Sequence, residues 1–322
     1  MMHIVSNIRN GSICRFSLAI SIFFILTVFI VHIPANAATA AQKSFQSPEE
    51  AVKALIDTLK AKDQKELIAI LGPGSKNLIS SGDEVADNEN RDRFVKLYEE
   101  KNKLEQSGEN KAVLYVGNED WPLPIPLVKK GKSWFFNTKE GKQEIISRRI
   151  GQNELSAIQV CLAFIDAQRE YAVKNYDGDE FTNYARKFVS EPGKKDGLYW
   201  ETKPGEEPSP LGPFIAAARI EGYTTKKFGE KPTPYHGYYY KILTAQGKNA
   251  PGGARSYMVN NKMIGGFALV AYPAVHGNSG IMTFMVNQDG KVYEKNLGKT
   301  TSEIIRAMKA FNPDKTWKIE QK

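Results

Sequence analysis

The spacing of apolar residues changes its period along this chain, and this change constrains the fold most. Val52, Leu55, Ile56 and Leu59 recur at intervals of three and four residues, which is typical of one face of a helix. From Ala112 onward the apolar residues fall in short runs that end at turn residues, which is typical of strands. Helices followed by a hairpin sheet predict an α+β fold with an antiparallel sheet.

The same order recurs in the second half of the chain. Leu155, Ile158, Leu162 and Ile165 predict a long amphipathic helix that begins after Asn153 as its N-cap. Short strands are then predicted at residues 238–243, 267–272, 282–286 and 292–295, before a C-terminal helix that carries Ile304, Ile305, Met308 and Phe311. We therefore expect two α+β lobes, at residues 45–149 and 150–317.

The N-terminal segment has the pattern of an export signal. Arg9 and Arg15 precede a largely apolar run over residues 16–31, and Ala35-Asn36-Ala37 follows as a small-x-small cleavage site. We expect residues 1–37 to be a signal peptide and the protein to be periplasmic or extracellular, with no transmembrane segment after cleavage. An uncleaved membrane anchor is the alternative, because the run is near the lower length limit for a spanning helix.

Removal of this segment sets the redox and charge properties of the mature chain. It takes away two arginines and no acidic residue, so the formal charge falls from +8 to +6. Cys161 stays as the only cysteine, on the apolar face of the predicted helix, so the fold must depend on a packed core rather than on internal disulfides. The basic residues are spread along the chain, and no motif predicts nucleic-acid binding.

Few residues of this chain match known catalytic or metal-binding patterns. His236 and His276 are far apart and no H-E-x-x-H is present, so zinc hydrolysis has no support. Asp177 and Asp179 lie in an acidic, turn-like segment that could begin a calcium site, but the spacing of an EF-hand loop fails after Asp179. We expect no cofactor, with calcium as the alternative at these two residues.

The most unusual composition is the aromatic segment at residues 235–240. Aromatic rings with polar tips bind sugars, peptides or protein partners, so we name Trp200, Tyr235, His236 and Tyr239 as candidate binding residues. The alternative is a core strand with Tyr238 and Tyr240 on one face and Tyr239 on the other. In the binding interpretation, Tyr235, His236 and at least one of the three tyrosines stay exposed and line a shared groove with Trp200.

Each predicted lobe resembles a known fold. The order of elements in residues 45–149 resembles the cone-shaped folds related to nuclear transport factor two, which implies a binding module. The second lobe resembles the globular part of type IV pilins and type II secretion pseudopilins, in its order of a long helix, a loop-rich span and an antiparallel sheet. It lacks the apolar N-terminal half of the helix that packs pilin filaments, so the resemblance does not extend to filament assembly.

Motifs spread over nearly the whole mature chain resemble one exported bacterial family, catalogued as domain of unknown function 2950. The motifs are Ser47-Pro48-Glu49-Glu50-Ala51, Ile70-Leu71-Gly72, Asp120-Trp121-Pro122, Arg148-Arg149-Ile150-Gly151, Asp196-Gly197-Leu198-Tyr199-Trp200 and Tyr235-His236-Gly237-Tyr238-Tyr239-Tyr240. The resemblance implies no activity, cofactor or catalytic residue.

These observations favour a non-catalytic, exported envelope protein that binds or assembles with a macromolecular partner, an envelope protein or polymer. A periplasmic hydrolase acting on peptide or glycan is one alternative. Carriage of a small ligand in the cone of the first lobe is the other, and an apolar pocket with few polar groups would favour it.

We predict that the exported protein begins at Ala38, because the small residues at the end of the apolar run are suited to signal peptidase. The intact mass of the protein purified from the envelope fraction measures this. A purified species that still carries residues 16–31 would contradict the prediction.

Overall fold

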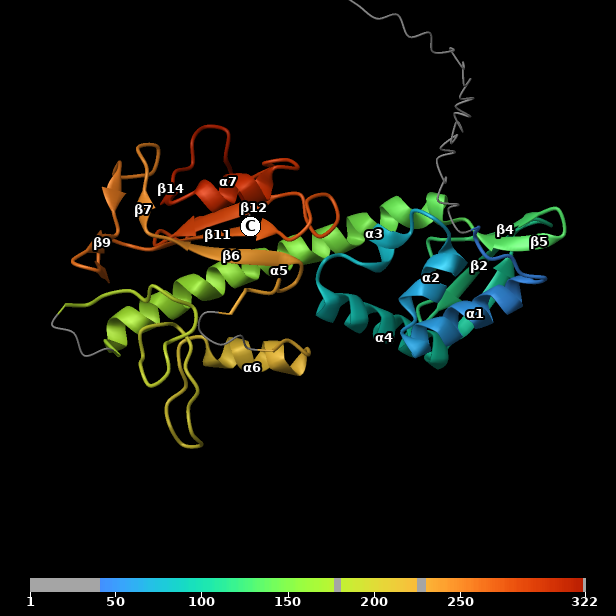
Figure 1. The fold of residues 1–322 in the computed structure, drawn as a ribbon, viewed down its shortest axis with the longest axis horizontal. Helices are drawn as coiled ribbons and strands as arrows, with labels where there is room; N and C mark the ends of the chain where they lie inside the picture. The colour runs from blue at the N-terminus through green and yellow to red at the C-terminus, as the bar shows by residue number, and fades with distance from the viewer. Residues whose placement is uncertain (1–40, 177–180, 225–229, 321–322) are drawn as a thin grey trace, which may run out of the picture. The chain divides into compact units, whose positions relative to one another are not determined.

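A computed structural model describes residues 41–176, 181–224 and 230–320 of the chain (Figure 1). The predicted signal peptide at residues 1–37 lies outside these described residues and stays a prediction. Helices and antiparallel sheets are both present, so the predicted α+β class is confirmed.

The first part of the described chain is a group of helices that begin where the sequence predicts. The side chain of Ser47 accepts a hydrogen bond from the Glu50 backbone N–H, and Pro48 is the first residue of α1. The side chain of Asp63 caps the next helix in the same way, by accepting from the Glu66 N–H. The four helices are α1 (Pro48–Ala61), α2 (Gln64–Leu71), α3 (Lys76–Ile79) and α4 (Glu84–Glu100).

An antiparallel sheet follows these helices, as the alternating pattern predicts. Its strands pair in the order β1-β2-β4-β5, with the short β3 beside β2. Ala112, Leu114 and Val116 of β2 are buried and alternate with partly exposed residues, so one face of the strand packs on the helices. The strands are β1 (Asn102–Gln106), β2 (Lys111–Val116), β3 (Trp121–Pro122), β4 (Leu127–Lys130) and β5 (Ser133–Phe136).

The long helix α5 (Thr138–Lys174) begins sixteen residues before its predicted start. Asn153 is therefore not an N-cap: it lies buried inside the helix, where its Nδ2 donates to the Ser279 carbonyl at 2.9 Å. The early turns of α5 lie close to the connector before β4, since a Cβ at Gly141 would come within 2.2 Å of the Pro124 carbonyl oxygen. Leu155, predicted on the apolar face, is 62% exposed.

The second half of α5 packs on a second five-stranded sheet, which we call the large sheet (Figure 1). The strands run in the order β15-β13-β12-β11-β6, and every pair is antiparallel. The predicted strands at residues 238–243, 267–272, 282–286 and 292–295 all occur, within one or two residues of their predicted ends. They are β6 (Tyr238–Leu243), β11 (Ala268–Pro273), β12 (Thr283–Asn287) and β13 (Tyr293–Lys295), with β15 (Lys318–Ile319) at the edge.

The C-terminal helix α7 (Thr301–Ala307) is shorter than predicted and does not reach Phe311. Lys241 of β6 donates from its Nζ to the carbonyls of Ile305 and Met308. This ammonium group supplies hydrogen bonds to carbonyl groups that have no partner within the helix at its C-terminal end. Phe311 instead lies in β14 (Ala310–Phe311), which pairs in parallel with β7 (Ala245–Gln246). The chain leaves the helix because this pairing requires an extended backbone.

The remaining elements are short. Helix α6 (Gly212–Ile220) begins with Pro213 in its first turn. The other strands are β8 (Arg255–Ser256), which pairs with β7, and the two-residue pair β9 (Met258–Val259) and β10 (Lys262–Met263).

Buried apolar residues form two separate clusters. One lies between α1, α2 and the first sheet, and the other between the second half of α5 and the large sheet. The predicted boundary between residues 149 and 150 falls inside α5, and residues 39–322 form one compact unit. The division into two lobes therefore stays a prediction.

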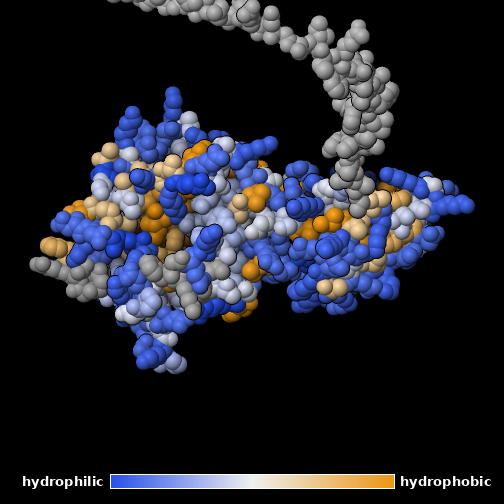
Figure 2. Space-filling view, in the orientation of Figure 1, coloured by the Kyte–Doolittle hydropathy of each residue, from blue (hydrophilic) through white to orange (hydrophobic). Residues whose placement is uncertain are grey.

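Hydrophilic residues cover most of the face in Figure 2, with small separate areas of hydrophobic ones. None of the helices in the described part of the chain has both the length and the apolar character that are needed to cross a membrane.

We predict that folding does not depend on redox conditions. The thiol of Cys161 is fully buried against the large sheet, as expected, and burial raises its pKa to about 12, so the thiol is unreactive at neutral pH. Cys161→Ala should lower the free energy of unfolding by about 1–2 kcal/mol through lost packing, measured by urea denaturation. Unfolding of the wild-type protein by a reducing agent alone would contradict this account.

Candidate functional site

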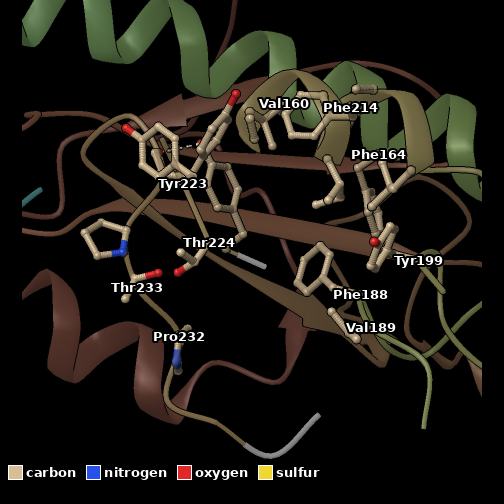
Figure 3. A pocket seen from close by; sticks show the side chains of 17 residues that line it. Val160, Phe164, Phe188, Val189, Tyr199, Phe214, Tyr223, Thr224, Pro232 and Thr233 are labelled. Atoms are coloured by element: carbon tan, nitrogen blue, oxygen red, sulfur yellow. Dashed lines mark hydrogen bonds between the residues drawn. The ribbon is translucent and has the colours of Figure 1, made fainter. Parts of the chain in front are cut away.

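A cavity of about 220 Å³ with a largely apolar wall lies between α5, α6 and β6 (Figure 3), and we call it the aromatic cavity. Seven aromatic side chains contribute to its wall. They are Phe164, Phe188, Tyr199, Phe214, Tyr223, Tyr235 and Tyr240. Aliphatic residues, two prolines and two threonines complete the wall, and none of the described lining residues is charged.

The hydroxyl groups of the cavity tyrosines bond to the protein. Tyr223 donates to Oδ2 of Asp83 at 3.0 Å, and Tyr235 donates to Oε2 of Glu221 at 3.3 Å. Tyr240 donates to the Tyr235 carbonyl at 3.3 Å. Burial raises the pKa of both Tyr223 and Tyr235, and the negative charges of Asp83 and Glu221 add to the effect. Both hydroxyls are therefore protonated donors at neutral pH.

Asp83 is the deepest charged group of this network, with an exposed fraction of 2%. Its Oδ1 caps α4 by accepting from the Ala86 N–H, and its Oδ2 accepts from the Tyr223 hydroxyl and from the Gly237 N–H at 2.9 Å. Three donors thus satisfy most of the acceptor sites of this carboxyl group. In the described structure, no Lys, Arg or His forms an ion pair with Asp83. The carboxylate is thus held by neutral donors and by the N-terminus of a helix.

A tight turn positions Tyr235 beside this network. His236 has a φ of 48° and Gly237 a φ of 73°, both in the left-handed region. A Cβ at position 237 would lie 2.4 Å from Nδ2 of Asn153, so only glycine fits. The turn brings the Gly237 N–H to Asp83 and aims the ring of Tyr235 at the cavity.

The structure brings two of the four predicted binding residues together. The rings of Tyr235 and His236 pack edge-to-face with their centroids 4.2 Å apart, and Nε2 of His236 lies 3.1 Å from Oε2 of Glu221. Tyr235 lines the aromatic cavity and both residues are partly buried. Tyr239 points to the other face of the sheet and packs on Tyr272, with centroids 5.6 Å apart.

Trp200 lies in a different hollow, a polar groove of about 980 Å³. Its ring packs edge-to-face on Tyr176, with centroids 4.8 Å apart, and Nζ of Lys195 lies 5.4 Å from its centroid. The prediction that Trp200 shares a groove with Tyr235 and His236 is therefore wrong, although Tyr199 contributes to both hollows. Binding by these four residues stays a prediction.

The alternation expected for β6 is confirmed. Tyr238 is fully buried and packs on Phe284, with centroids 5.9 Å apart. Tyr240 points to the same side and reaches the aromatic cavity, whereas Tyr239 faces away. The strand therefore supports the core with one tyrosine and the cavity with another.

A smaller cavity of about 180 Å³ lies in the N-terminal cluster. Nine leucine and isoleucine side chains form most of its wall, six of them from α1 to α3, and Asp87, Arg91 and Arg149 add charged groups. Burial raises the pKa of Asp87 and lowers that of Arg149. Arg149 donates to the carbonyls of Asn77 and Leu78, so its guanidinium is part of the framework.

Within the described residues, no three His, Cys, Asp or Glu side chains gather closely enough to hold a metal ion. Asp177 and Asp179, the candidate calcium ligands, lie outside the described residues. The calcium alternative therefore stays a prediction.

Sequence reasoning missed most of the cavity wall. Phe164, Phe188, Phe214 and Tyr223 come from four separate segments, and each alone looks like an ordinary core residue. One signal was available in the sequence. Asp83 lies three residues before Ala86, which is the spacing between a helix N-cap and the backbone N–H that it accepts from. That signal predicts α4, but it does not predict that Tyr223 and Gly237 share the same carboxylate.

We predict that Tyr223→Phe lowers the free energy of unfolding by about 2 kcal/mol, because it removes a hydrogen bond to a buried carboxylate. Tyr272→Phe is the matched control, since the described structure gives the Tyr272 hydroxyl no hydrogen-bond partner. Urea denaturation of the two variants compares them. Equal stability losses would show that the Tyr223–Asp83 contact contributes nothing specific.

Comparison with known proteins gives one match. The family model described as Protein of unknown function (DUF2950) matches residues 42–319. No curated protein and no solved structure matches the chain significantly, so the pilin-like and cone-like resemblances stay predictions. Because the match covers nearly all of the described structure, the chain belongs to the family Protein of unknown function (DUF2950).

Proposed function

We propose that the protein is an exported, non-catalytic binding protein of the cell envelope, which holds an apolar group of a macromolecular partner in the aromatic cavity. The observation that carries this proposal is the cavity itself. Its wall is built from aromatic and aliphatic side chains, and its tyrosine hydroxyls are engaged by the protein. A hollow of this kind favours an apolar group, which gains free energy by leaving water.

The chemistry of the wall supports binding more than hydrolysis. Among the described lining residues there is no Asp, Glu, His, Ser or Cys, so the cavity offers neither a general base nor a common nucleophile. Glu221 and His236 lie behind Tyr235 and bond to each other. A periplasmic hydrolase that acts on peptide or glycan is therefore the weaker alternative.

Carriage of a small ligand is the second candidate function. The smaller cavity in the N-terminal cluster favours it, because that cavity has an apolar floor and a few charged groups. It lies in the part of the chain predicted to form a cone. A ligand that binds there would be unaffected by changes in the aromatic cavity.

The export signal and the charge support an envelope location. The basic and apolar pattern of residues 1–37 is that of a cleaved signal peptide, and the mature chain keeps a formal charge of +6. A moderate positive charge favours contact with anionic envelope polymers. Fractionation of cells that express the full chain tests the location directly.

We predict that filling the aromatic cavity abolishes binding. Ala163 of α5 lines the cavity, and Ala163→Phe places a ring where the apolar group would lie. The neutral fluorescent probe N-phenyl-1-naphthylamine should lose at least tenfold in affinity, and the protein should lose its retention in envelope extracts. Gln152→Phe, at an exposed position on the same helix, should bind as the wild type does.

Two results would count against the proposed site. Unchanged probe binding and retention in Ala163→Phe would remove the aromatic cavity as the site. If the probe were lost instead when Leu55 in the N-terminal cavity is changed to Trp, small-ligand carriage would be the better account.

A further inference from the structure

The rings around the aromatic cavity are suited to a positive charge. Four of the seven aromatic residues are tyrosines, and the faces of aromatic rings carry negative potential that attracts cations. This attraction is strongest where water is excluded, as in a hollow lined by rings. A neutral apolar group gains only the hydrophobic contribution from the same wall.

Two of these rings are polarised by carboxylates. The hydroxyl of Tyr223 donates to Asp83, and the hydroxyl of Tyr235 donates to Glu221. Donation to a negative group shifts electron density toward the ring, because linked hydrogen bonds polarise one another. The rings of Tyr223 and Tyr235 also pack edge-to-face, with centroids 4.6 Å apart, so both polarised rings belong to one corner of the cavity.

Among the described residues, the ionisable side chains that bond to the two tyrosines of this corner or to their partners are Asp83, Glu221 and His236. Asp83 is buried and forms no ion pair within the described structure, and Glu221 pairs with His236, whose charge depends on protonation. The described lining residues include no Lys, Arg or His. Arg219 lies outside the lining; it donates to the Tyr199 hydroxyl at 2.8 Å, and its guanidinium lies 5.6 Å from the centroid of the Tyr199 ring. A cation in the cavity would thus complement the buried carboxylate.

We infer that the aromatic cavity selects ligands that carry an alkylated ammonium group, and this inference rests on the proposed binding function of the same cavity. The described lining residues supply seven aromatic rings and no carboxylate. An ammonium with N–H groups would lose its hydrogen bonds to water on burial, whereas an ammonium covered by methyl groups has none to lose. The quaternary group is therefore the form that fits best.

Choline and its neutral isostere 3,3-dimethyl-1-butanol test this inference, because a carbon atom replaces the charged nitrogen in the isostere. Isothermal titration calorimetry of the mature protein should give an affinity at least tenfold higher for choline. Equal affinities, or tighter binding of the isostere, would overturn the inference and leave the proposed apolar site intact. Binding of neither compound nor of N-phenyl-1-naphthylamine would overturn both.

A variant that removes one negative charge distinguishes the contribution of the carboxylates to choline binding from the contribution of the cavity's shape. Glu221→Gln keeps an oxygen acceptor for Tyr235 and removes the negative charge. It should weaken choline binding at least threefold and leave the isostere unchanged, whereas Glu303→Gln on α7 should change neither. An equal loss for both compounds in Glu221→Gln, or no loss for either, would contradict the role of charge.

The same chemistry occurs in a lipid headgroup and in free solutes, and vesicles distinguish these sources. Co-sedimentation with phosphatidylcholine vesicles, competed by choline and absent with phosphatidylglycerol vesicles, would identify the headgroup as the ligand. Binding of choline without co-sedimentation would identify a free quaternary solute. Co-sedimentation with phosphatidylcholine vesicles that choline does not displace would overturn the inference, because the headgroup would then bind outside the cavity.

Discussion

The carboxylate of Asp83 accepts hydrogen bonds from the first turn of α4, from the hydroxyl of Tyr223 and from the backbone of Gly237. Tyr223 and Gly237 both lie more than a hundred residues after the first turn of α4, so this one side chain joins the N-terminal helices to the turn before β6. A buried carboxylate is costly unless its lone pairs are satisfied, so all three donors must be in place together. One wall of the aromatic cavity depends on this contact. The contact holds Tyr223 in position and fixes the path of the chain through Tyr235 and Gly237.

Helix α5 provides the second connection between the hydrophobic clusters. At about 1.5 Å per residue its 37 residues span about 55 Å, so its first turns reach the N-terminal cluster and its later turns pack on the large sheet. Near its middle, Arg149 donates to Asn278 and Asn153 donates to Ser279, both in the loop after β11. Val160, Ala163 and Phe164 follow on the same helix and form the cavity wall. The cavity is therefore fixed by a rigid element on one side and by the Asp83 network on the other.

The elements with strong local signals were predictable. Ser47 and Asp63 start their helices where the capping pattern places them, and the alternating tyrosines of β6 point to opposite faces as expected. The start of α5 was not predictable, because Gly141, Gly151 and Asn153 resemble a break, and only the tertiary contacts of Gly141 and Asn153 show why each is there. Only part of the wall of the aromatic cavity was predictable, because its residues are also brought together by tertiary contacts. Tyr235 belongs to a conspicuous segment, whereas Phe164, Phe188, Phe214 and Tyr223 meet only in the folded chain.

The central claim is that the Asp83 network holds the cavity wall in place, and hydrogen exchange at the Gly237 amide tests it most directly. This N–H donates to the buried carboxylate although it lies in a turn between secondary-structure elements. The account predicts that the amide exchanges as slowly as the core amides of α1 and β11, because opening the contact requires much of the fold to open. Exchange at the rate of an open loop, with those core amides still protected, would contradict the account.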